Sequence, residues 1–491
     1  MDDFSQETYL DQKLIKYQSS DYYPFHMPGH KRTPLDFPNP YTIDITEIEG
    51  FDNLHHPQDI LHHAQRRAAR IYQAKETFYL VNGSTCGILA AISAALPKGG
   101  TLLMARNCHK SVYHAAHLRE LHTVYLLPDV TDFGIMGSIP PSQVERMLTL
   151  HPEIQAVFIT SPTYDGVVSD IQRIADLCHQ RRIPLLVDEA HGAHFIFSDM
   201  FPESALRCGA DIVIQSLHKT LPCFTQTALL HLNSDLVPVQ KIRQFLDIYE
   251  TSSPSYLLMA SMEQGLRYMN SPKGQQQMTH FSRLLEYFYQ NTQKLAHLQL
   301  FSIDKNCFDR DPSKLLISVG NTGLTGKELY SLLLKKYHLQ MEMVSGHYIV
   351  ALTTLMDSIE GFERLSQALQ EIDRVYTGVR QESGAPAALL RERGHIPGTA
   401  LTCQELYTVP RQNITIARAL ESEGTVVPFQ NSAGYISQEY VYLYPPGIPF
   451  LAPGELITKD IVDRIRLCQV QGLSIEGMND ATNTEIRVVK F

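Results

Sequence analysis

The sequence predicts an α/β fold in which a mostly parallel, seven-stranded central sheet is covered by helices and followed by smaller α+β parts. Two patterns predict it. From about residue 51 to residue 300, short apolar runs alternate with helical stretches, which is typical of a parallel sheet buried on both faces. Beyond residue 300, strand and helix patterns are mixed. With 491 residues, the chain is long enough for two or three domains.

Residues 1–50 are expected to form an N-terminal arm rather than a domain. Five prolines prevent a long helix in this segment: Pro24, Pro28, Pro34, Pro38 and Pro40. Since such an arm has no core of its own, it must lie either on the body of the chain or on a partner subunit.

Residues 51–300 are expected to form the large domain. Helices are expected at 60–74, 87–96 and 171–181. The seven expected strands are 78–81, 101–104, 123–127, 156–160, 185–188, 212–216 and 228–232. Ligands of such sheets bind beyond the carboxyl ends of the strands. Five polar residues lie at or just past these ends, and we therefore expect them at one rim: Asn82, His109, Ser161, Asp188 and Ser216.

The rest of the chain is expected to form a small α+β domain at 301–380 and a C-terminal domain at 381–491. The first has strand patterns at 315–319 and 348–353 and a helix pattern at 326–335. Residues 378–386 have the composition of a linker. The C-terminal domain has a helix pattern at 415–421 and strand patterns at 425–427 and 440–444.

The charge and the cysteines exclude several classes of function. The net charge is −10 with no basic block, so nucleic acids and anionic membrane surfaces are not expected partners. No apolar run approaches the roughly 20 residues that span a bilayer. The acidic start has no apolar segment typical of a signal peptide, so we expect a cytoplasmic protein. The eight cysteines are scattered, which favours reduced thiols over disulfides or a zinc site.

Two strand ends carry the residues that a pyridoxal phosphate (PLP) enzyme needs. Asp188 ends one apolar run, and His218 and Lys219 follow another at 212–214. A lysine forms a Schiff base with the PLP aldehyde, and an aspartate keeps the ring nitrogen protonated so that the ring withdraws electrons. Taken alone, Asp188 is better explained as a cap or a structural ion pair, and Lys219 as a solvated lysine. The apolar strands and His218 favour the cofactor site.

The segment Asn82-Gly83-Ser84-Thr85 follows a strand and opens a helix. Glycine lets the backbone approach a phosphate closely, and the free N–H groups at a helix start favour an anion. Ser84 and Thr85 add hydroxyl donors. A plain helix cap is the commoner explanation of such a segment. Beside Asp188 and Lys219, a phosphate site becomes the better one.

Several histidines have two possible explanations. His109 follows the strand at 101–104, where an imidazole could lie flat on the cofactor ring, although a loop histidine without such a role is commoner. His191 and His194 could suggest a metal. No third ligand occurs at matching spacing, so we expect no metal site. His191 is instead expected to orient groups around Asp188.

The chain resembles the bacterial Orn/Lys/Arg decarboxylases, PLP enzymes of the aspartate-aminotransferase-like fold. Nine segments carry the resemblance in family order and span nearly the whole chain. They are Phe25-His26-Met27-Pro28-Gly29-His30-Lys31, Asp44-Ile45-Thr46-Glu47, Asn82-Gly83-Ser84-Thr85, Asn107-Cys108-His109-Lys110-Ser111, Ser161-Pro162-Thr163-Tyr164-Asp165-Gly166, Asp188-Glu189-Ala190-His191-Gly192-Ala193-His194, Ser216-Leu217-His218-Lys219, Thr251-Ser252-Ser253-Pro254 and Tyr444-Pro445-Pro446-Gly447-Ile448-Pro449. The resemblance implies the PLP-dependent transferase fold of type I.

The resemblance also implies roles for single residues. Lys219 is similar to the Schiff-base lysine, Asp188 to the partner of the pyridine nitrogen, and His109 to the residue stacked on the ring. Ala190 would pack against the opposite ring face. The groups around the phosphate would be Ser84, Thr85, Ser216 and His218. In this family the loop that contains Ser252 reaches the phosphate of the neighbouring subunit, which implies a homodimer with shared active sites.

One departure from the family limits what the resemblance implies. Longer, acid-inducible members begin with a wing domain that builds decamers, whereas here the first family segment starts at residue 25. The chain therefore resembles the short members without a wing, which are often biosynthetic arginine or lysine decarboxylases. Decamers and induction by acid are not expected.

The expected reaction is decarboxylation of a basic amino acid, first of all L-arginine to agmatine in polyamine biosynthesis, then of lysine or ornithine. Lys219 or His218 would return a proton to the α-carbon. An acidic group should face the distal cation of the substrate. The candidates are Glu455, Asp44 and Glu47, each otherwise expected to be a solvated surface carboxylate.

Two alternatives stay open because fold does not fix reaction. The chain could catalyse another PLP reaction, as an aminotransferase, an aldolase or a β-eliminating lyase. It could also be a PLP-binding regulator without turnover, although a regulator has little use for the complete set of Asp188, Lys219 and His109.

Overall fold

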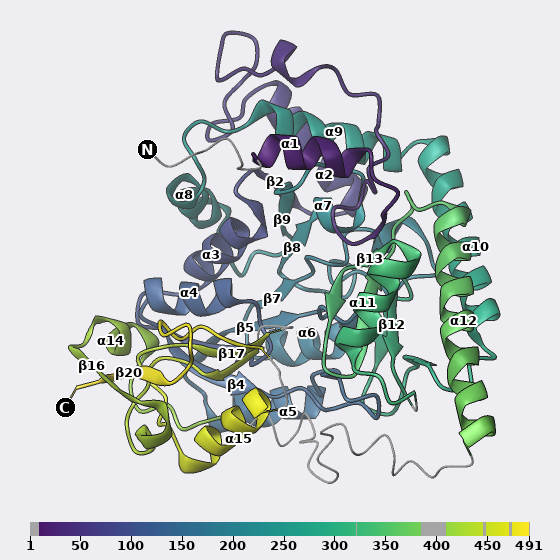
Figure 1. Cartoon of the computed structure of the whole chain (residues 1–491). Helices are drawn as coiled ribbons and strands as arrows, with labels where there is room; N and C mark the ends of the chain where they lie inside the picture. Colours follow the sequence, from purple (N-terminus) through teal and green to yellow (C-terminus); the bar gives the residue numbers. More distant parts are fainter. Residues whose placement is uncertain (1–8, 321, 384–408, 445–447, 471–473, 491) are drawn as a thin grey trace, which may run out of the picture.

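The computed structural model of the protein describes residues 9–320, 322–383, 409–444, 448–470 and 474–490. Figure 1 shows three parts: a large sheet with its helices, a smaller sheet beside two long helices, and a C-terminal part that lies against one end of the large sheet. In the described residues, no helix is both long enough and apolar enough to cross a membrane.

The central sheet has seven strands in the order β2-β9-β8-β7-β5-β3-β4. Only β9 runs against the others, since it pairs antiparallel with both of its neighbours. The strands are β2 (Glu76–Leu80), β3 (Thr101–Ala105), β4 (His122–Leu126), β5 (Ile154–Thr160), β7 (Leu185–Asp188), β8 (Ile212–Ser216) and β9 (Ala228–Leu232). The predicted α/β fold with a mostly parallel sheet of seven strands is therefore confirmed.

Helices cover both faces of this sheet, and several begin at caps that the sequence provides. The Asp170 side chain accepts the Arg173 N–H at the start of α6, and Ser255 accepts the Leu258 N–H at the start of α9. The helices are α2 (Ile60–Tyr72), α3 (Gly83–Ala95), α4 (Lys110–Leu118), α5 (Pro141–Leu150), α6 (Ile171–His179), α7 (Leu217–Thr220), α8 (Val239–Tyr249) and α9 (Tyr256–Met269), with a 3-10 turn η3 (Phe195–Phe197). Helix α3 packs against α4 and α8, and α5 packs against α6.

The second sheet is antiparallel, with the order β10-β12-β15-β14. Its strands are β10 (Gln299–Leu300), β12 (Lys314–Ser318), β14 (Met343–Val344) and β15 (Tyr348–Leu352), and its helices are α10 (Pro272–Thr292), α11 (Gly326–Tyr337) and α12 (Ile359–Ser383). A short antiparallel pair of β6 (Val167–Val168) and β11 (Asp309–Arg310) joins it to the large sheet region.

The linker expected at 378–386 is wrong over its first six residues. Helix α12 continues to Ser383, because Gly378 is the one residue among these six that weakens a helix, and a single glycine costs only about 1 kcal/mol. The remaining three positions lie outside the described residues. The division into domains at 1–50, 51–300, 301–380 and 381–491 stays our proposal.

The N-terminal arm is tied to the second sheet. Helix α1 (Leu10–Gln18) ends before the first of the five prolines, and β1 (Tyr23–Phe25) then pairs in parallel with β13 (Leu339–Met341). A 3-10 turn η2 (Pro40–Thr42) follows. The Phe25 ring is fully buried in the main core. The arm therefore lies on the body of its own chain from β1 onward.

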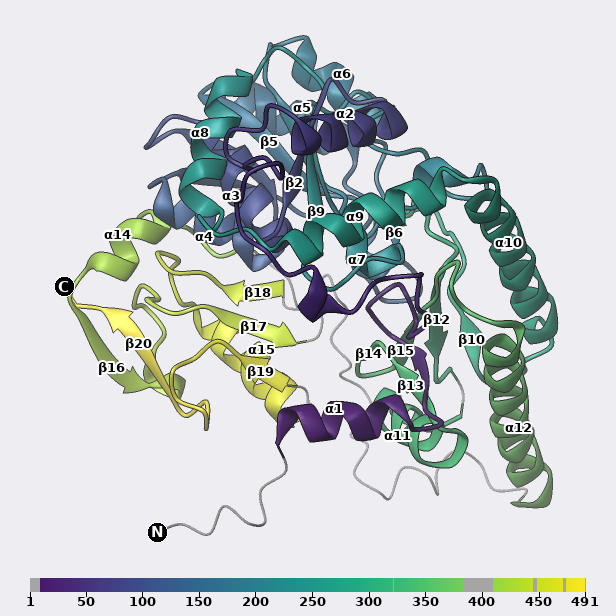
Figure 2. The same cartoon turned by 90° about the horizontal axis from the view of Figure 1, so that it is seen from above.

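The C-terminal part has its own apolar cluster, which includes Phe429, Val441 and Ile465. It contains α14 (Ile416–Glu421), β16 (Gly424–Pro428), η5 (Phe429–Asn431), β17 (Val441–Tyr444), β18 (Ile448–Leu451), α15 (Lys459–Val470), β19 (Ser474–Glu476) and β20 (Glu485–Val489). Helix α14 packs against α4 of the large domain. Figure 2 shows this part beside the large sheet, on the opposite side from α12. Residues 445–447, at the centre of the last family segment, lie outside the described residues.

Candidate active site

The predicted site residues meet at the carboxyl end of the central sheet. Asp188 ends β7 and Ser216 ends β8, which are neighbouring parallel strands. The short helix α7 follows β8 at once and carries His218 and Lys219. Helix α3 starts directly after β2, and α4 starts after β3 at the same edge. The topology of the sheet thus brings segments from four parts of the chain to one place.

Asp188 is a buried carboxylate at a strand end, with 4% of its surface exposed. Its Oδ1 accepts the Ala190 N–H at 3.0 Å, which fixes the orientation of the carboxylate. Burial raises the pKa of Asp188, and the charge of Lys219 opposes this shift. A carboxylate in this state needs a cationic N–H partner to stay ionised.

Lys219 is half-buried, and its Nζ lies 3.1 Å from Nε2 of His191. Burial lowers the pKa of Lys219, whereas the carboxylates of Asp188 and Glu342 oppose the shift. A lowered pKa increases the fraction of the neutral amine, and only the neutral amine is a nucleophile.

The start of α3 is open to an anion. Its cap residue, Asn82, makes no side-chain cap hydrogen bond, because the Asn82 amide donates instead to the Tyr249 carbonyl at 3.1 Å. The first-turn N–H groups therefore lack the usual side-chain acceptor. The hydroxyls of Ser84 and Ser216 lie 2.6 Å apart beside this helix start, and Thr85 is exposed on its first turn.

Three further predicted residues surround Lys219 and Asp188. His109 caps α4, where its Nδ1 accepts the Ser111 N–H, and burial followed by the charge of Lys219 lowers its pKa to about 4. His218 donates from Nδ1 to the Thr227 carbonyl at 2.9 Å, and burial lowers its pKa to about 4. Both rings are therefore neutral at pH 7. Ala190 is buried two residues after Asp188, the last residue of β7.

Ser252 is the predicted site residue that the structure does not bring to the others. It is exposed in the loop between α8 and α9. In the same loop, the Thr251 carbonyl lies 2.9 Å from Nε2 of His55. A role for Ser252 in this chain's own site has no support from the described contacts.

The three candidates for the distal carboxylate have different surroundings. Asp44 is exposed and Glu47 is half-buried. Glu455 is fully buried, and its two oxygens bind Nη1 and Nη2 of Arg106 at 2.5 and 2.9 Å. Both expectations for Glu455 are thus wrong in this structure: it is no solvated carboxylate, and its charge is already matched by Arg106. A charged residue that follows a proline-rich turn gives no sign of such a partner.

The structure adds residues that the sequence did not indicate. Lys314, the first residue of β12, is buried and places its Nζ 2.7 Å from Nδ1 of His191. Glu342 accepts hydrogen bonds from the Tyr164 hydroxyl at 2.5 Å and from the Met27 N–H at 2.8 Å. A lysine that opens the apolar run Leu315-Leu316-Ile317 is a signal of burial that could have been used.

The N-terminal segment closes over the Lys219 turn. The Gly29 N–H donates to the His218 carbonyl at 2.6 Å, and the Thr354 hydroxyl donates to the Gly29 carbonyl at 2.7 Å. A Cβ atom at Gly29 would lie 2.6 Å from the Leu221 carbonyl oxygen. Only glycine permits so close an approach of two backbones.

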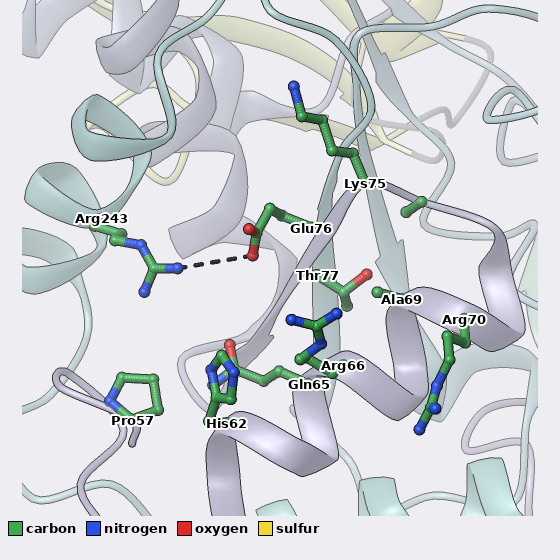
Figure 3. Close-up of a pocket in the computed structure, with 11 residues that line it drawn as sticks. Pro57, His62, Gln65, Arg66, Ala69, Arg70, Lys75, Glu76, Thr77 and Arg243 are labelled. Carbon is green, nitrogen blue, oxygen red and sulfur yellow. Dashed lines mark ion pairs between the residues drawn. The ribbon is translucent and has the colours of Figure 1, made fainter. Parts of the chain in front are cut away.

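A separate hollow lies on the surface between α2, the start of β2 and α8 (Figure 3). Its lining includes Arg66, Arg70 and Arg243, of which Arg243 pairs with Glu76 at 3.7 Å. None of the predicted site residues lines it. Within the described part of the chain, no three His, Cys, Asp or Glu residues come together as metal ligands do.

Comparisons with known proteins agree with the geometry. The family model described as "Orn/Lys/Arg decarboxylase, major domain" matches residues 8–312, and the model of the C-terminal domain of the same family matches residues 401–483. The "Arginine decarboxylase" of Bacillus anthracis is 31% identical over 99% of this chain and 97% of its own length. The "Arginine decarboxylase" of Bacillus subtilis (strain 168) is 32% identical over 99% of this chain and 98% of its own.

Solved structures show the fold. The lysine decarboxylase LdcF of Francisella novicida superposes with a TM-score of 0.80 at 20% identity, covering 98% of this chain and 81% of that one. Together with other structural neighbours, this likeness confirms the predicted fold of type I PLP-dependent enzymes.

Proposed function

The chain belongs to the Orn/Lys/Arg decarboxylase family and is an amino-acid decarboxylase, and from this premise we propose that it converts L-arginine to agmatine and CO₂ with PLP held at the Lys219 site. The observation that carries the proposal is the coincidence of the family match and of relatives that cover nearly the whole chain with a site in which the buried Asp188 carboxylate and the half-buried Lys219 follow neighbouring parallel strands.

Three features of the site fit PLP. Within the described residues, the buried carboxylate of Asp188 has no ion pair, and a protonated pyridine nitrogen would supply one. The start of α3 lacks a side-chain cap and lies beside the hydroxyls of Ser84 and Ser216, as a phosphate requires. Lys219 offers an amine whose pKa burial has lowered.

Each of these residues would hold one part of the cofactor. We assign the ring nitrogen to Asp188, the covalent attachment to Nζ of Lys219, and the phosphate to Ser84, Thr85, Ser216 and His218. His109 and Ala190 would contact the two faces of the ring, with His191 beside it. Ser252, which is exposed, would act in the site of a second subunit rather than in its own.

When bound, PLP would withdraw the electrons of the bond that breaks at the α-carbon of the substrate. Asp188 would keep the proton on the ring nitrogen, because its buried carboxylate gains an ion pair in doing so. Nζ of Lys219 would supply the proton that replaces CO₂. His218 is the second candidate for this proton, but its neutral ring at pH 7 has its one N–H directed at the Thr227 carbonyl.

We propose arginine rather than lysine as the substrate because the two relatives described above, which match nearly the whole chain, are named arginine decarboxylases. The two Bacillus arginine decarboxylases cover 97% and 98% of their own length in the match, at 31% and 32% identity. The lysine decarboxylase LdcF is only 20% identical.

Product analysis tests the proposal. The holoenzyme is incubated separately with arginine, lysine and ornithine, and agmatine, cadaverine and putrescine are measured by mass spectrometry. Agmatine should form fastest, and Lys219→Ala should abolish it, whereas the exposed Lys98→Ala should not change it. Cadaverine or putrescine as the main product would instead identify lysine or ornithine as the substrate. Keto-acid products would indicate an aminotransferase, and a PLP absorbance unaffected by every amino acid would indicate a regulator.

We further propose a cytoplasmic homodimer that serves polyamine biosynthesis. Helix α1 has no buried residue and exposes Leu10, Leu14 and Ile15 at 73%, 58% and 64%. Apolar side chains gathered on an arm are typical of a subunit interface, and a second copy of this chain fits because family members share their sites between subunits. Sedimentation equilibrium tests the dimer, and a monomer at micromolar concentration would contradict it.

A further inference from the structure

Three nitrogen-bearing side chains form a hydrogen-bonded series that ends at Lys219 of the proposed cofactor site. Nζ of Lys314 lies 2.7 Å from Nδ1 of His191, and Nε2 of the same ring lies 3.1 Å from Nζ of Lys219. The three residues come from different elements: the start of β12, the loop after β7, and α7. The second sheet thus contributes a side chain to the chemistry at the edge of the first.

Lys314 is an unusual member of this hydrogen-bonded series because it is almost completely buried, with 1% of its surface exposed. Within the described residues it makes no ion pair, and its hydrogen bond is to His191. The carboxylates whose charges act on Lys314 have hydrogen-bond partners of their own: Asp311 accepts from the Ser313 hydroxyl at 2.6 Å, Asp165 from the Tyr348 hydroxyl at 3.0 Å, and Glu342 from the Tyr164 hydroxyl at 2.5 Å.

The hydrogen-bond pattern limits how many protons the three side chains can carry together. Burial, and then the charges of Lys219 and Lys314, keep the pKa of His191 well below its usual range, so the ring is neutral. A neutral imidazole has one N–H and one lone pair. Two ammonium groups cannot both donate to it, so both hydrogen bonds form only when one of the two lysines is a neutral amine.

We propose that Lys314 is a positioning residue that, through His191, takes up the proton that Lys219 must lose to become a nucleophile and returns it when Lys219 must act as an acid. In the transfer, the N–H bond at Nζ of Lys219 breaks and one forms at Nε2 of His191. At the same time, the N–H bond at Nδ1 breaks and one forms at Nζ of Lys314. His191 ends in its other tautomer, and the total charge stays +1. The inference rests on the proposed role of Lys219.

The charges around Lys219, His191 and Lys314 allow this exchange of a proton. Asp188 and Glu342 favour a proton on Lys219, whereas Asp311, Glu342 and Asp165 favour one on Lys314. Burial lowers the pKa of Lys314 to about 8, so this amine gains and loses a proton near neutral pH. The remaining titratable groups that act on His191 are His218 and His194.

The test measures how fast the full-length protein, stripped of PLP, captures PLP covalently at different pH values. Capture needs the neutral amine, so the midpoint of the pH dependence reports the charge of Lys219. Lys314→Met removes a repelling charge and frees Nε2 of His191 to accept from a Lys219 ammonium. Both effects raise the midpoint, by about one pH unit, so that capture at pH 7 slows roughly tenfold.

Two further variants separate positioning from proton transfer. Lys314→Arg keeps the charge and the hydrogen bond to Nδ1 but does not give up a proton. It should therefore keep the wild-type midpoint and lower the turnover of the reconstituted enzyme about tenfold or more. Lys314→Gln is neutral like Lys314→Met and should show the same upward shift, which protects the test against a variant that does not fold.

Lys110→Met is the matched control. Lys110 is exposed and its charge acts on His109. Its replacement therefore takes away a nearby positive charge without breaking the hydrogen bonds between Lys314, His191 and Lys219. The midpoint for Lys219 should not move. An unshifted midpoint in Lys314→Met and Lys314→Gln, or an equal shift in Lys110→Met, would overturn the inference alone. Failure of the wild-type protein to capture PLP would overturn the proposed function together with it.

Discussion

Asp188 and Lys219 are brought together because each lies at or just past the end of a buried, parallel strand. The sequence indicates both positions, since an apolar run that stops at a charged residue marks a strand end. It does not indicate Lys314 or Glu342, which reach the site from the second sheet. Contacts between separate sheets depend on how the two pack, and no local pattern records that packing.

Asp188→Asn should stabilise the protein without PLP and remove the stabilisation that PLP confers. Burial raises the pKa of Asp188 above its unfolded value, so at pH 7 ionisation of this carboxyl destabilises the folded state without a cofactor. Asparagine removes that charge but cannot hold a protonated ring nitrogen. Thermal unfolding with and without PLP checks both effects, and Asp199→Asn, at an exposed position, is the control. Equal PLP-induced shifts in Asp188→Asn and wild type would contradict the assignment.

His231 should make stability depend on pH. It is fully buried between the Thr77 hydroxyl and the Gln215 amide, and burial lowers its pKa from 6.5 to about 3. The unfolded chain therefore binds a proton first as the pH falls, and the free energy of unfolding falls from about pH 6.5 downward.

The loss due to His231 should reach about 2 kcal/mol by pH 5. Urea unfolding at pH 7 and pH 5 measures it. His231→Gln should reduce the difference between the two pH values, whereas the exposed His63→Gln should leave it unchanged. The same pH dependence in all three proteins would show that His231 does not cause it.

At the scale of elements, the strands of the central sheet were predicted to within two residues at each end. Short apolar runs between polar ends leave little choice of boundaries. The linker at 378–386 shows the opposite case. Glycine and polar residues there suggested a break, but α12 continues to Ser383, because a single glycine costs a helix only about 1 kcal/mol.

The contact between the N-terminal segment and the Lys219 turn should be sensitive to one methyl group. Gly29→Ala places a Cβ 2.6 Å from the Leu221 carbonyl oxygen, so one backbone must move. The free energy of unfolding should fall by about 2 kcal/mol, and PLP capture should slow because α7 shifts.

Gly50→Ala is the control for the Gly29 prediction. A Cβ at Gly50 meets no atom within 4 Å, so this variant carries only the penalty of a positive φ. Denaturant unfolding and PLP capture compare the two. Normal capture in Gly29→Ala would show that the contact does not position Lys219.

At the scale of the whole molecule, the C-terminal part is held to the large sheet by a buried ion pair. Arg106 follows β3 and binds Glu455 with two hydrogen bonds, and both side chains are almost completely buried. The sequence placed Glu455 near the site but could not reveal this partner, because 349 positions separate the two residues. The domain division itself remains a proposal.

Glu455→Gln should destabilise the protein strongly because it leaves the Arg106 charge buried without a counter-ion. Breaking a buried pair costs about 3–5 kcal/mol. The double variant Arg106→Met/Glu455→Gln should be more stable than Glu455→Gln, since it removes the unpaired charge. Urea unfolding and limited proteolysis of the C-terminal part measure the effect. A double variant that is no more stable than Glu455→Gln would contradict a direct pairing of the two residues.

Reduction of the holoenzyme with borohydride, followed by peptide mass spectrometry, tests the central assignment most directly. The account predicts that the phosphopyridoxyl group is fixed on the peptide that contains Lys219 and on no other lysine, and that Lys219→Ala abolishes the label. A label on Lys314 or Lys31 instead, or an unlabelled protein that still releases CO₂ from arginine, would contradict it.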